Sequence, residues 1–155
     1  MTAAHCLDGE EVEDFMVVLN EHDFLATNET VGRTIIRRVI EMIPYPYYLE
    51  STFYGDMALL QLDRSVDITK FTTTPVCLPT DVSNSYIDSE VIGSGWGTLL
   101  ENGRKSPKLF EVLLKVFSNP SCNDYHSSSK SEPMQVTDNM LCAGYHEGGR
   151  DTCSV

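Results

Sequence analysis

Short apolar runs, separated by turn-forming residues, dominate the pattern of hydrophobic and polar positions along the chain. Four runs predict β-strands, because each is short and the last partly alternates apolar with polar positions. The predicted strands cover residues 15–19, 57–62, 91–95 and 111–117. Many short strands with turn residues between them, and no internal repeat, indicate an all-β sandwich or barrel.

Two other segments have helical features. Residues 119–126 predict a short helical turn, with Asn119 as its cap and Pro120 in its first position. Farther upstream, four apolar residues follow the spacing i, i+3, i+4 and i+7: Ile36, Val39, Ile40 and Ile43. Taken alone, this spacing favours a helix.

Length and charge limit the size of the domain and the classes of partner that the protein can bind. A chain of 155 residues forms at most one modest domain, and an apolar content of 41% is enough for a packed core. The formal charge of −12 argues against nucleic acid and anionic membranes as partners, because both require a basic face. We interpret the acidity as a source of solubility, with a cationic substrate as the functional alternative. No apolar stretch approaches the ~18 residues of a membrane span, and the N-terminus lacks the features of a signal peptide.

Five cysteines are scattered along the chain, and none forms a C-x-x-C pair, which argues against a zinc ribbon. An odd, scattered set suits a disulfide framework in an oxidising compartment, with at least one partner missing. Asn28 begins the sole N-glycosylation sequon, because Pro120 removes the second candidate. Both features point to secretion.

His5 and Asp56 are the residues with the most informative surroundings. A histidine acts as a general base near neutral pH, and a carboxylate bonded to one ring nitrogen fixes its tautomer. The two residues lie far apart in the sequence, so only a tertiary fold can join them. The alternative for an isolated histidine and aspartate is an ordinary structural role. The flanking residues decide between this role and a catalytic pair.

Six segments together resemble the trypsin family of serine endopeptidases, which has the chymotrypsin fold. Residues 2–6 read T-A-A-H-C and residues 56–60 read D-M-A-L-L, similar to the family's T-A-A-H-C and D-I-A-L-L. The other four are P-V-C-L-P at 75–79, G-W-G at 95–97, M-L-C-A-G at 140–144 and G-G-R-D-T-C at 148–153. The matches follow the family's order and span nearly the whole chain, so together they are specific although no single one is.

The resemblance implies an all-β fold: an incomplete double Greek-key β-barrel of the trypsin/chymotrypsin type. Residues 1–77 would form the rest of the first barrel, and residues 78–155 part of the second. It also implies that residues 34–42 form a strand, in spite of the helical spacing of their apolar positions.

Within that fold, the resemblance gives His5 the role of general base and Asp56 that of the acid that orients it. Asp151 matches the carboxylate at the base of the primary specificity pocket, where a buried anion pairs with Arg or Lys side chains. The implied partner is a protein or peptide substrate cut after a basic residue, and a surface loop acid is the alternative for Asp151. The implied location is secreted or extracellular, and no cofactor is required.

The resemblance also assigns the cysteines and a candidate calcium loop. Cys122 and Cys142 match a bonded pair, whereas three other cysteines match residues whose partners lie outside this chain: Cys6, Cys77 and Cys153. The segment from Glu21 resembles the start of the family's calcium-binding loop, with Glu21, Asp23 and Glu29 as candidate ligands. Calcium takes six to eight oxygens, so we interpret the segment as a solvated acidic loop.

The resemblance stops after Cys153, where the family continues toward G-D-S-G-G-P and this chain reads Ser154 and Val155. Ser154 lacks every neighbour of the nucleophile, so no residue is assigned that role. We therefore expect a truncated form without peptidase activity, with exposed strand edges and apolar faces that favour aggregation. Two hypotheses remain: a truncated product or incomplete reading frame of an active trypsin-like protease, and a non-catalytic homologue that binds or regulates other proteins.

Overall fold

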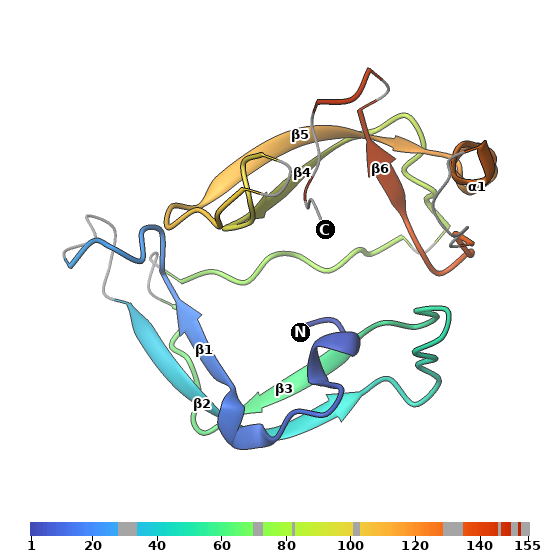
Figure 1. Ribbon diagram of the computed structural model, residues 1–155. Helices are drawn as coiled ribbons and strands as arrows, with labels where there is room; N and C mark the ends of the chain where they lie inside the picture. Colours follow the sequence, from blue (N-terminus) through green and yellow to red (C-terminus); the bar gives the residue numbers. More distant parts are fainter. Residues whose placement is uncertain are drawn as a thin grey trace. The chain divides into compact units, whose positions relative to one another are not determined.

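The structure, a computed structural model, describes residues 1–27, 34–69, 73–81, 83–100, 103–128, 135–145, 147–149 and 152. Its elements are the 3-10 turns η1 (His5–Leu7) and η2 (Val12–Asp14), the strands β1 (Met16–Leu19), β2 (Ile35–Pro44), β3 (Ala58–Leu62), β4 (Glu90–Gly95) and β5 (Phe110–Phe117), the helix α1 (Asn119–Ser128) and the strand β6 (Cys142–Gly144). The strands form two antiparallel three-stranded sheets, ordered β1-β2-β3 and β4-β5-β6 (Figure 1). The chain divides into unit 1, Met1–Glu21 with Asn28–Cys77, and unit 2, His22–Thr27 with Leu78–Val155.

Unit 1 is built around the central strand β2, which pairs with β1 on one side and β3 on the other. Its buried apolar cluster lies where η1 meets β3 and consists of Ala4, Leu7 and Ala58. Partly buried side chains pack around this cluster: Phe15, Met42, Tyr48 and Leu60. The turn that contains His5 is therefore anchored in the core by residues on both sides of the histidine.

A β-bulge explains the misleading spacing of the apolar residues in β2. Between Val39 and Glu41 the pairing with β3 shifts, so that Ile40 is an extra residue and the alternation changes phase. Ile36, Ile40 and Ile43 are all exposed, whereas Val39 is buried. The spacing arises from the two-residue alternation of a strand, interrupted by one extra residue. The helix favoured by the spacing is therefore wrong, and the strand implied by the resemblance is confirmed.

Unit 2 has β5 at the centre of its sheet, and Leu114 and Val116 supply its most buried strand side chains. The short segment His22–Thr27 joins this unit through backbone hydrogen bonds. The Leu109 N–H donates to the His22 carbonyl at 2.8 Å, and the same carbonyl accepts a hydrogen bond from the Trp96 indole at 3.2 Å.

Helix α1 confirms the predicted helical turn and extends it to Ser128. The predicted cap is wrong by one residue. The hydroxyl oxygen of Ser118 accepts a hydrogen bond from the Ser121 N–H at 3.3 Å, and the Ser118 carbonyl accepts the first helical bond, from the Cys122 N–H at 3.1 Å. Ser118 therefore caps the helix, because its hydroxyl satisfies an amide that has no partner within the helix.

The two antiparallel sheets and the one helix of the described residues confirm the predicted all-β class. All four strands predicted from the pattern are present, with bounds that differ by one residue at most. The pattern missed β6, which has only three residues. None of the described helices is long and apolar enough to cross a membrane.

Candidate active site

His5 begins the turn η1, and the residues around it explain why the turn forms. The Leu7 N–H donates to the Ala4 carbonyl at 2.9 Å, and the Asp8 N–H donates to the His5 carbonyl at 3.4 Å. Ala4 and Leu7 are buried, whereas the His5 side chain is 49% exposed. The small side chain of Ala4 lets the turn lie against Ala58, so the chain presents His5 outward from a fixed base.

Asp56 lies near the end of a closed loop between β2 and β3. The Tyr45 N–H donates to the Met57 carbonyl at 2.8 Å and closes the loop at its base. Gly55 has a φ of +67°, and a Cβ there would overlap the ring of Tyr45. A glycine is therefore required immediately before Asp56, both for its backbone conformation and for the close approach of the tyrosine.

The structure brings His5 and Asp56 together. Nδ1 of His5 lies 2.6 Å from Oδ2 of Asp56, and the His5 backbone N–H donates to Oδ1 at 2.8 Å. An ionised carboxylate only accepts hydrogen bonds, so Nδ1 carries the proton and Nε2 of the neutral ring keeps its lone pair. This arrangement makes Nε2 the basic atom.

The pKa of Asp56 is lowered from 3.8 by these contacts. Burial alone raises the pKa of this carboxyl, but hydrogen bonds from the His5 backbone and ring, the charge of His5 and the Ala4 backbone outweigh it. The Asp56 side chain is 21% exposed. Asp56 is therefore an anion at neutral pH, as a group that stabilises an imidazolium must be.

Two other side chains lie close to the ring of His5. The thiol of Cys6 lies 3.5 Å from Nε2. Phe53 meets the His5 ring edge-on, with centroids 5.6 Å apart and planes at 88°. Phe53 also has a φ of +53°, a conformation that is strained for a bulky residue. The strain therefore lies beside the histidine and aspartate pair.

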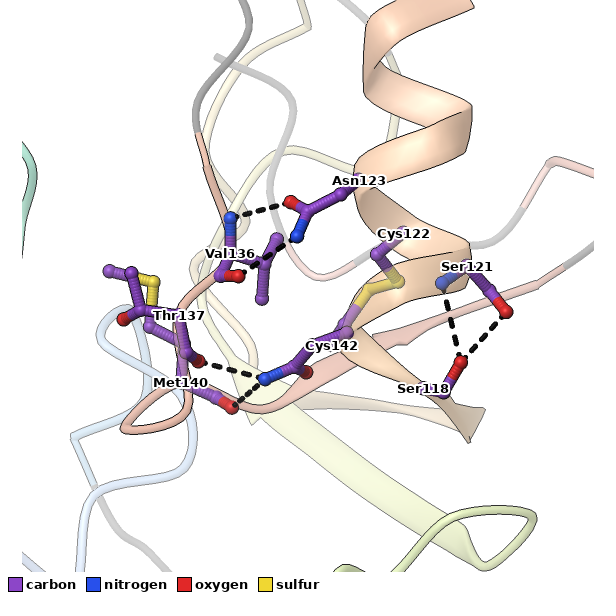
Figure 2. The surroundings of a disulfide bond; sticks show 9 residues. Ser118, Ser121, Cys122, Asn123, Val136, Thr137, Met140 and Cys142 are labelled. Carbon is purple, nitrogen blue, oxygen red and sulfur yellow. Dashed lines mark hydrogen bonds between the residues drawn. A yellow bond between two sulfur atoms is a disulfide. The ribbon is translucent and has the colours of Figure 1, made fainter.

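The disulfide implied for Cys122 and Cys142 is present in unit 2. The bond joins α1 to β6 across 20 residues of sequence, with the Cα atoms 6.6 Å apart (Figure 2). Closing a loop of this length stabilises a fold by about 3 kcal/mol in the chain-entropy model. Among the described residues, Cys6 and Cys77 are free and exposed, and Cys153 lies outside them.

Two asparagines of α1 fix the chain that returns to β6, a feature that sequence reasoning missed. Asn123 makes two hydrogen bonds with the backbone of Val136, accepting from its N–H at 2.7 Å and donating to its carbonyl at 3.0 Å (Figure 2). Asn119 donates to the carbonyls of Thr137 and Met140, at 2.8 and 3.3 Å. No motif identifies these residues, because an asparagine with a backbone partner far along the chain has no local sequence signal.

The segment that contains the predicted specificity residue is described only in part. Asp151 lies outside the described residues, as do Asn28, Glu29 and Ser154. Thr152 is described and packs against Gly93 of β4, where a Cβ would overlap the methyl group of Thr152. A cavity of about 240 Å³ lies beside it, lined by residues of β4, β5 and the loop that follows β4, together with Gly149 and Thr152.

Of the candidate calcium ligands, Glu21 and Asp23 are described and Glu29 is not; among the described residues no group of three or more His, Cys, Asp or Glu side chains could hold a metal ion. Oδ1 of Asp23 accepts a hydrogen bond from the Leu25 N–H at 3.0 Å, and Oδ2 lies 3.8 Å from Nζ of Lys108. The solvated acidic loop remains our interpretation.

Comparison with known proteins identifies the relatives of the chain. A family profile described as Trypsin matches residues 1–154. The chain is 30% identical to serine proteinase stubble of Drosophila melanogaster, 31% to venom serine protease Bi-VSP of Bombus ignitus and 30% to trypsin eta of Drosophila melanogaster. These alignments cover 98%, 99% and 98% of the chain, but only 19%, 42% and 54% of the relatives. The chain therefore belongs to the trypsin family of serine proteases.

Proposed function

We propose that His5 and Asp56 are the general base and the orienting acid of a trypsin-like serine endopeptidase site. The observation that carries this proposal is the distance of 2.6 Å between Nδ1 of His5 and Oδ2 of Asp56. The second oxygen of the same carboxylate accepts from the His5 backbone. Because both oxygens are engaged by one residue, the ring cannot turn away without losing its partner.

The proposed chemistry follows from the positions of the two ring nitrogens. Nε2 accepts the proton of a serine hydroxyl as that hydroxyl attacks the scissile carbonyl, and then returns it to the leaving amine. Asp56 keeps the proton on Nδ1 and stabilises the imidazolium without itself becoming protonated. The lowered pKa of Asp56 supports this role, because the carboxylate stays ionised at neutral pH.

The substrate and location proposed for the whole protein rest on the resemblance. We propose cleavage of protein substrates after Arg or Lys, with Asp151 as the partner of the basic side chain. We also propose a secreted protein in which residues 1–77 and 78–155 belong to the two barrels. The Cys122–Cys142 disulfide supports an oxidising compartment.

The 155-residue polypeptide by itself is proposed to be inactive. The G-D-S-G-G-P motif is not among its residues. Because that motif supplies the nucleophile and the backbone amides of the oxyanion hole, the polypeptide has neither assigned to it. Histidine and aspartate alone cannot form the acyl-enzyme. A non-catalytic binding role is the alternative, and the intact pair of His5 and Asp56 favours the protease.

Two experiments test these proposals. Hydrolysis of an arginine ester by the 155-residue polypeptide should equal that of its His5→Ala variant, and a rate well above the variant would contradict the proposed inactivity. If the transcript continues in frame to G-D-S-G-G-P, its full product should hydrolyse the ester, and Asp56→Asn should lower kcat about 10⁴-fold. A stop codon after Val155, with the protein found intact in secretions, would instead support the binding role.

A further inference from the structure

The turn that carries His5 is held on both sides of the histidine. On the N-terminal side, Thr2 and Ala58 exchange backbone hydrogen bonds of 2.9 and 2.8 Å. On the C-terminal side, the hydroxyl of Tyr48 donates to Oδ2 of Asp8 at 3.0 Å. Asp8 is also the residue whose N–H closes η1 on the His5 carbonyl. The tyrosine therefore contacts the residue that ends the turn.

Tyr48 belongs to the same loop as Asp56 and is well placed to hold the turn. The Tyr48 N–H donates to the Tyr45 carbonyl at 3.0 Å, and Leu49 and Tyr54 pair across the loop. The Tyr48 side chain packs against the buried cluster of Ala4, Leu7 and Ala58. With both its backbone and its ring fixed, the hydroxyl is aimed at Asp8 at a small entropic cost.

We infer that Tyr48 and Asp8 are positioning residues, whose hydrogen bond fixes the end of the His5 turn on the loop that leads to Asp56. Neither touches the reacting atoms. The turn η1 and this loop also meet through Asp56, through the ring of Phe53, and through the Tyr48 ring itself, which packs against the cluster that includes Leu7. The Tyr48 hydrogen bond is therefore a restraint independent of the carboxylate, and this inference rests on the proposed function of His5 and Asp56.

The chemistry of the phenol suits a permanent donor. Burial, the hydrogen bond to Asp8 and neighbouring negative charges raise the pKa of Tyr48 to about 12. The hydroxyl therefore keeps its proton throughout the pH range in which a histidine works as a base. A restraint of this kind does not switch off when the imidazole gains or loses its proton.

The test measures the tautomer of the His5 ring by ¹⁵N NMR in the 155-residue chain, at about pH 9, where imidazoles are neutral. Tyr48→Phe keeps the ring in the core but removes the donor. We expect the ratio of Nδ1–H to Nε2–H tautomer to fall about threefold, which is the size of effect of one exposed hydrogen bond. Asp8→Ala, a change at an exposed side chain, should have the same effect.

Three control variants separate the possible causes. Asp8→Asn keeps an acceptor and should restore the ratio to within about twofold of the wild type, which a purely electrostatic role of Asp8 would not allow. Tyr47→Phe changes an exposed neighbouring tyrosine and should leave the ratio unchanged. Asp56→Asn should invert the ratio, because the amide can donate to Nδ1.

The outcomes distinguish this inference from the proposed function. If Asp56→Asn inverts the ratio but Tyr48→Phe and Asp8→Ala leave it unchanged, the positioning role is refuted and the proposed pair stands. If Asp56→Asn also leaves the ratio unchanged, the pair itself is refuted, and the positioning role with it.

Discussion

Units 1 and 2 are both three-stranded antiparallel sheets, but different interactions tie their connecting segments to the strands. In unit 1 the turn of His5 is held to the loop of Asp56 by hydrogen bonds and ring contacts, and its two cysteines are free. In unit 2 a disulfide and two asparagine side chains hold the chain between α1 and β6. We therefore expect a reductant to destabilise unit 2 and acid to destabilise unit 1.

Loss of the disulfide should have the largest effect, and it should be confined to unit 2. Replacing both Cys122 and Cys142 by Ser removes the restraint on a 20-residue loop, at an expected cost of about 3 kcal/mol in the free energy of unfolding. Hydrogen exchange measured by mass spectrometry should show faster exchange in β5 and α1, with β1 and β2 unchanged. Cys77→Ser alters a free, exposed residue and should stay within about 0.5 kcal/mol. Equal loss of protection in both units would show that the disulfide does not stabilise unit 2 alone.

Asn123→Ala should have the second largest effect, again in unit 2. The change leaves the N–H and the carbonyl of Val136 without their side-chain partner, and Val136 is buried. Unsatisfied buried backbone groups cost about 1–3 kcal/mol. Denaturant unfolding checks the value, with Ser127→Ala, an exposed hydroxyl on the same helix, as the control. A cost no larger than that of the control would show that Asn123 does not contribute to holding this segment.

In unit 1, acid rather than reductant should be the destabilising condition. The pKa of Asp56 is lower in the folded chain than its ordinary 3.8, so its stabilising contribution is present above that value. This contribution is lost as the pH falls through the folded pKa. Asp56→Asn should remove the contribution, at a cost of about 1 kcal/mol in the free energy of unfolding at neutral pH. The stability of unit 1 should then fall less steeply as the pH is lowered. If unit 1 of Asp56→Asn loses stability at low pH as the wild type does, the stabilising role of the Asp56 carboxylate is contradicted. Glu10→Gln changes an exposed acid and is the control.

The smallest effect should come from Tyr48 at high pH. Its pKa of about 12 lies above the ordinary value of 10, so the folded state retains a proton that the unfolded chain loses. Stability of unit 1 should therefore fall as the pH rises from about 10 to 12. Tyr48→Phe should abolish this fall, and Asp8→Asn should lower the pKa of Tyr48, measured by ¹³C NMR of the phenol ring. A phenol that titrates at the same pH in Asp8→Asn would show that the contact with Asp8 does not contribute.

Local patterns identified most of the fold, because strands bounded by turn residues leave a signal that needs no tertiary information. The pattern failed at β2, where a bulge at Ile40 turned a period of two into an apparent helical spacing. It failed again at the N-cap of α1, because serine and asparagine are both good cap residues and the sequence does not decide between Ser118 and Asn119. In the fold Ser118 caps the helix, and the Asn119 side chain bonds to distant carbonyls instead. Both errors arise where tertiary contacts decide between local alternatives.

The site residues His5 and Asp56 came from family resemblance rather than from spacing, since residues so far apart carry no local sign of contact. Tyr48, Asp8 and Phe53 were not identified at all. None of the three belongs to a recognisable motif, and the significance of each depends on where the loop before Asp56 folds. The positive φ of Phe53 likewise has no sequence signature.

The central claim is that Asp56 holds the proton of His5 on Nδ1, so that Nε2 is the base. The most direct test is ¹⁵N NMR of the neutral His5 ring in the wild-type chain and in Asp56→Asn, with the signal assigned by its loss in His5→Ala. We predict that the Nδ1–H tautomer dominates in the wild type and that the Nε2–H tautomer dominates in Asp56→Asn. A wild-type ring that is mainly protonated on Nε2, or a ratio that does not respond to Asp56→Asn, would contradict the claim.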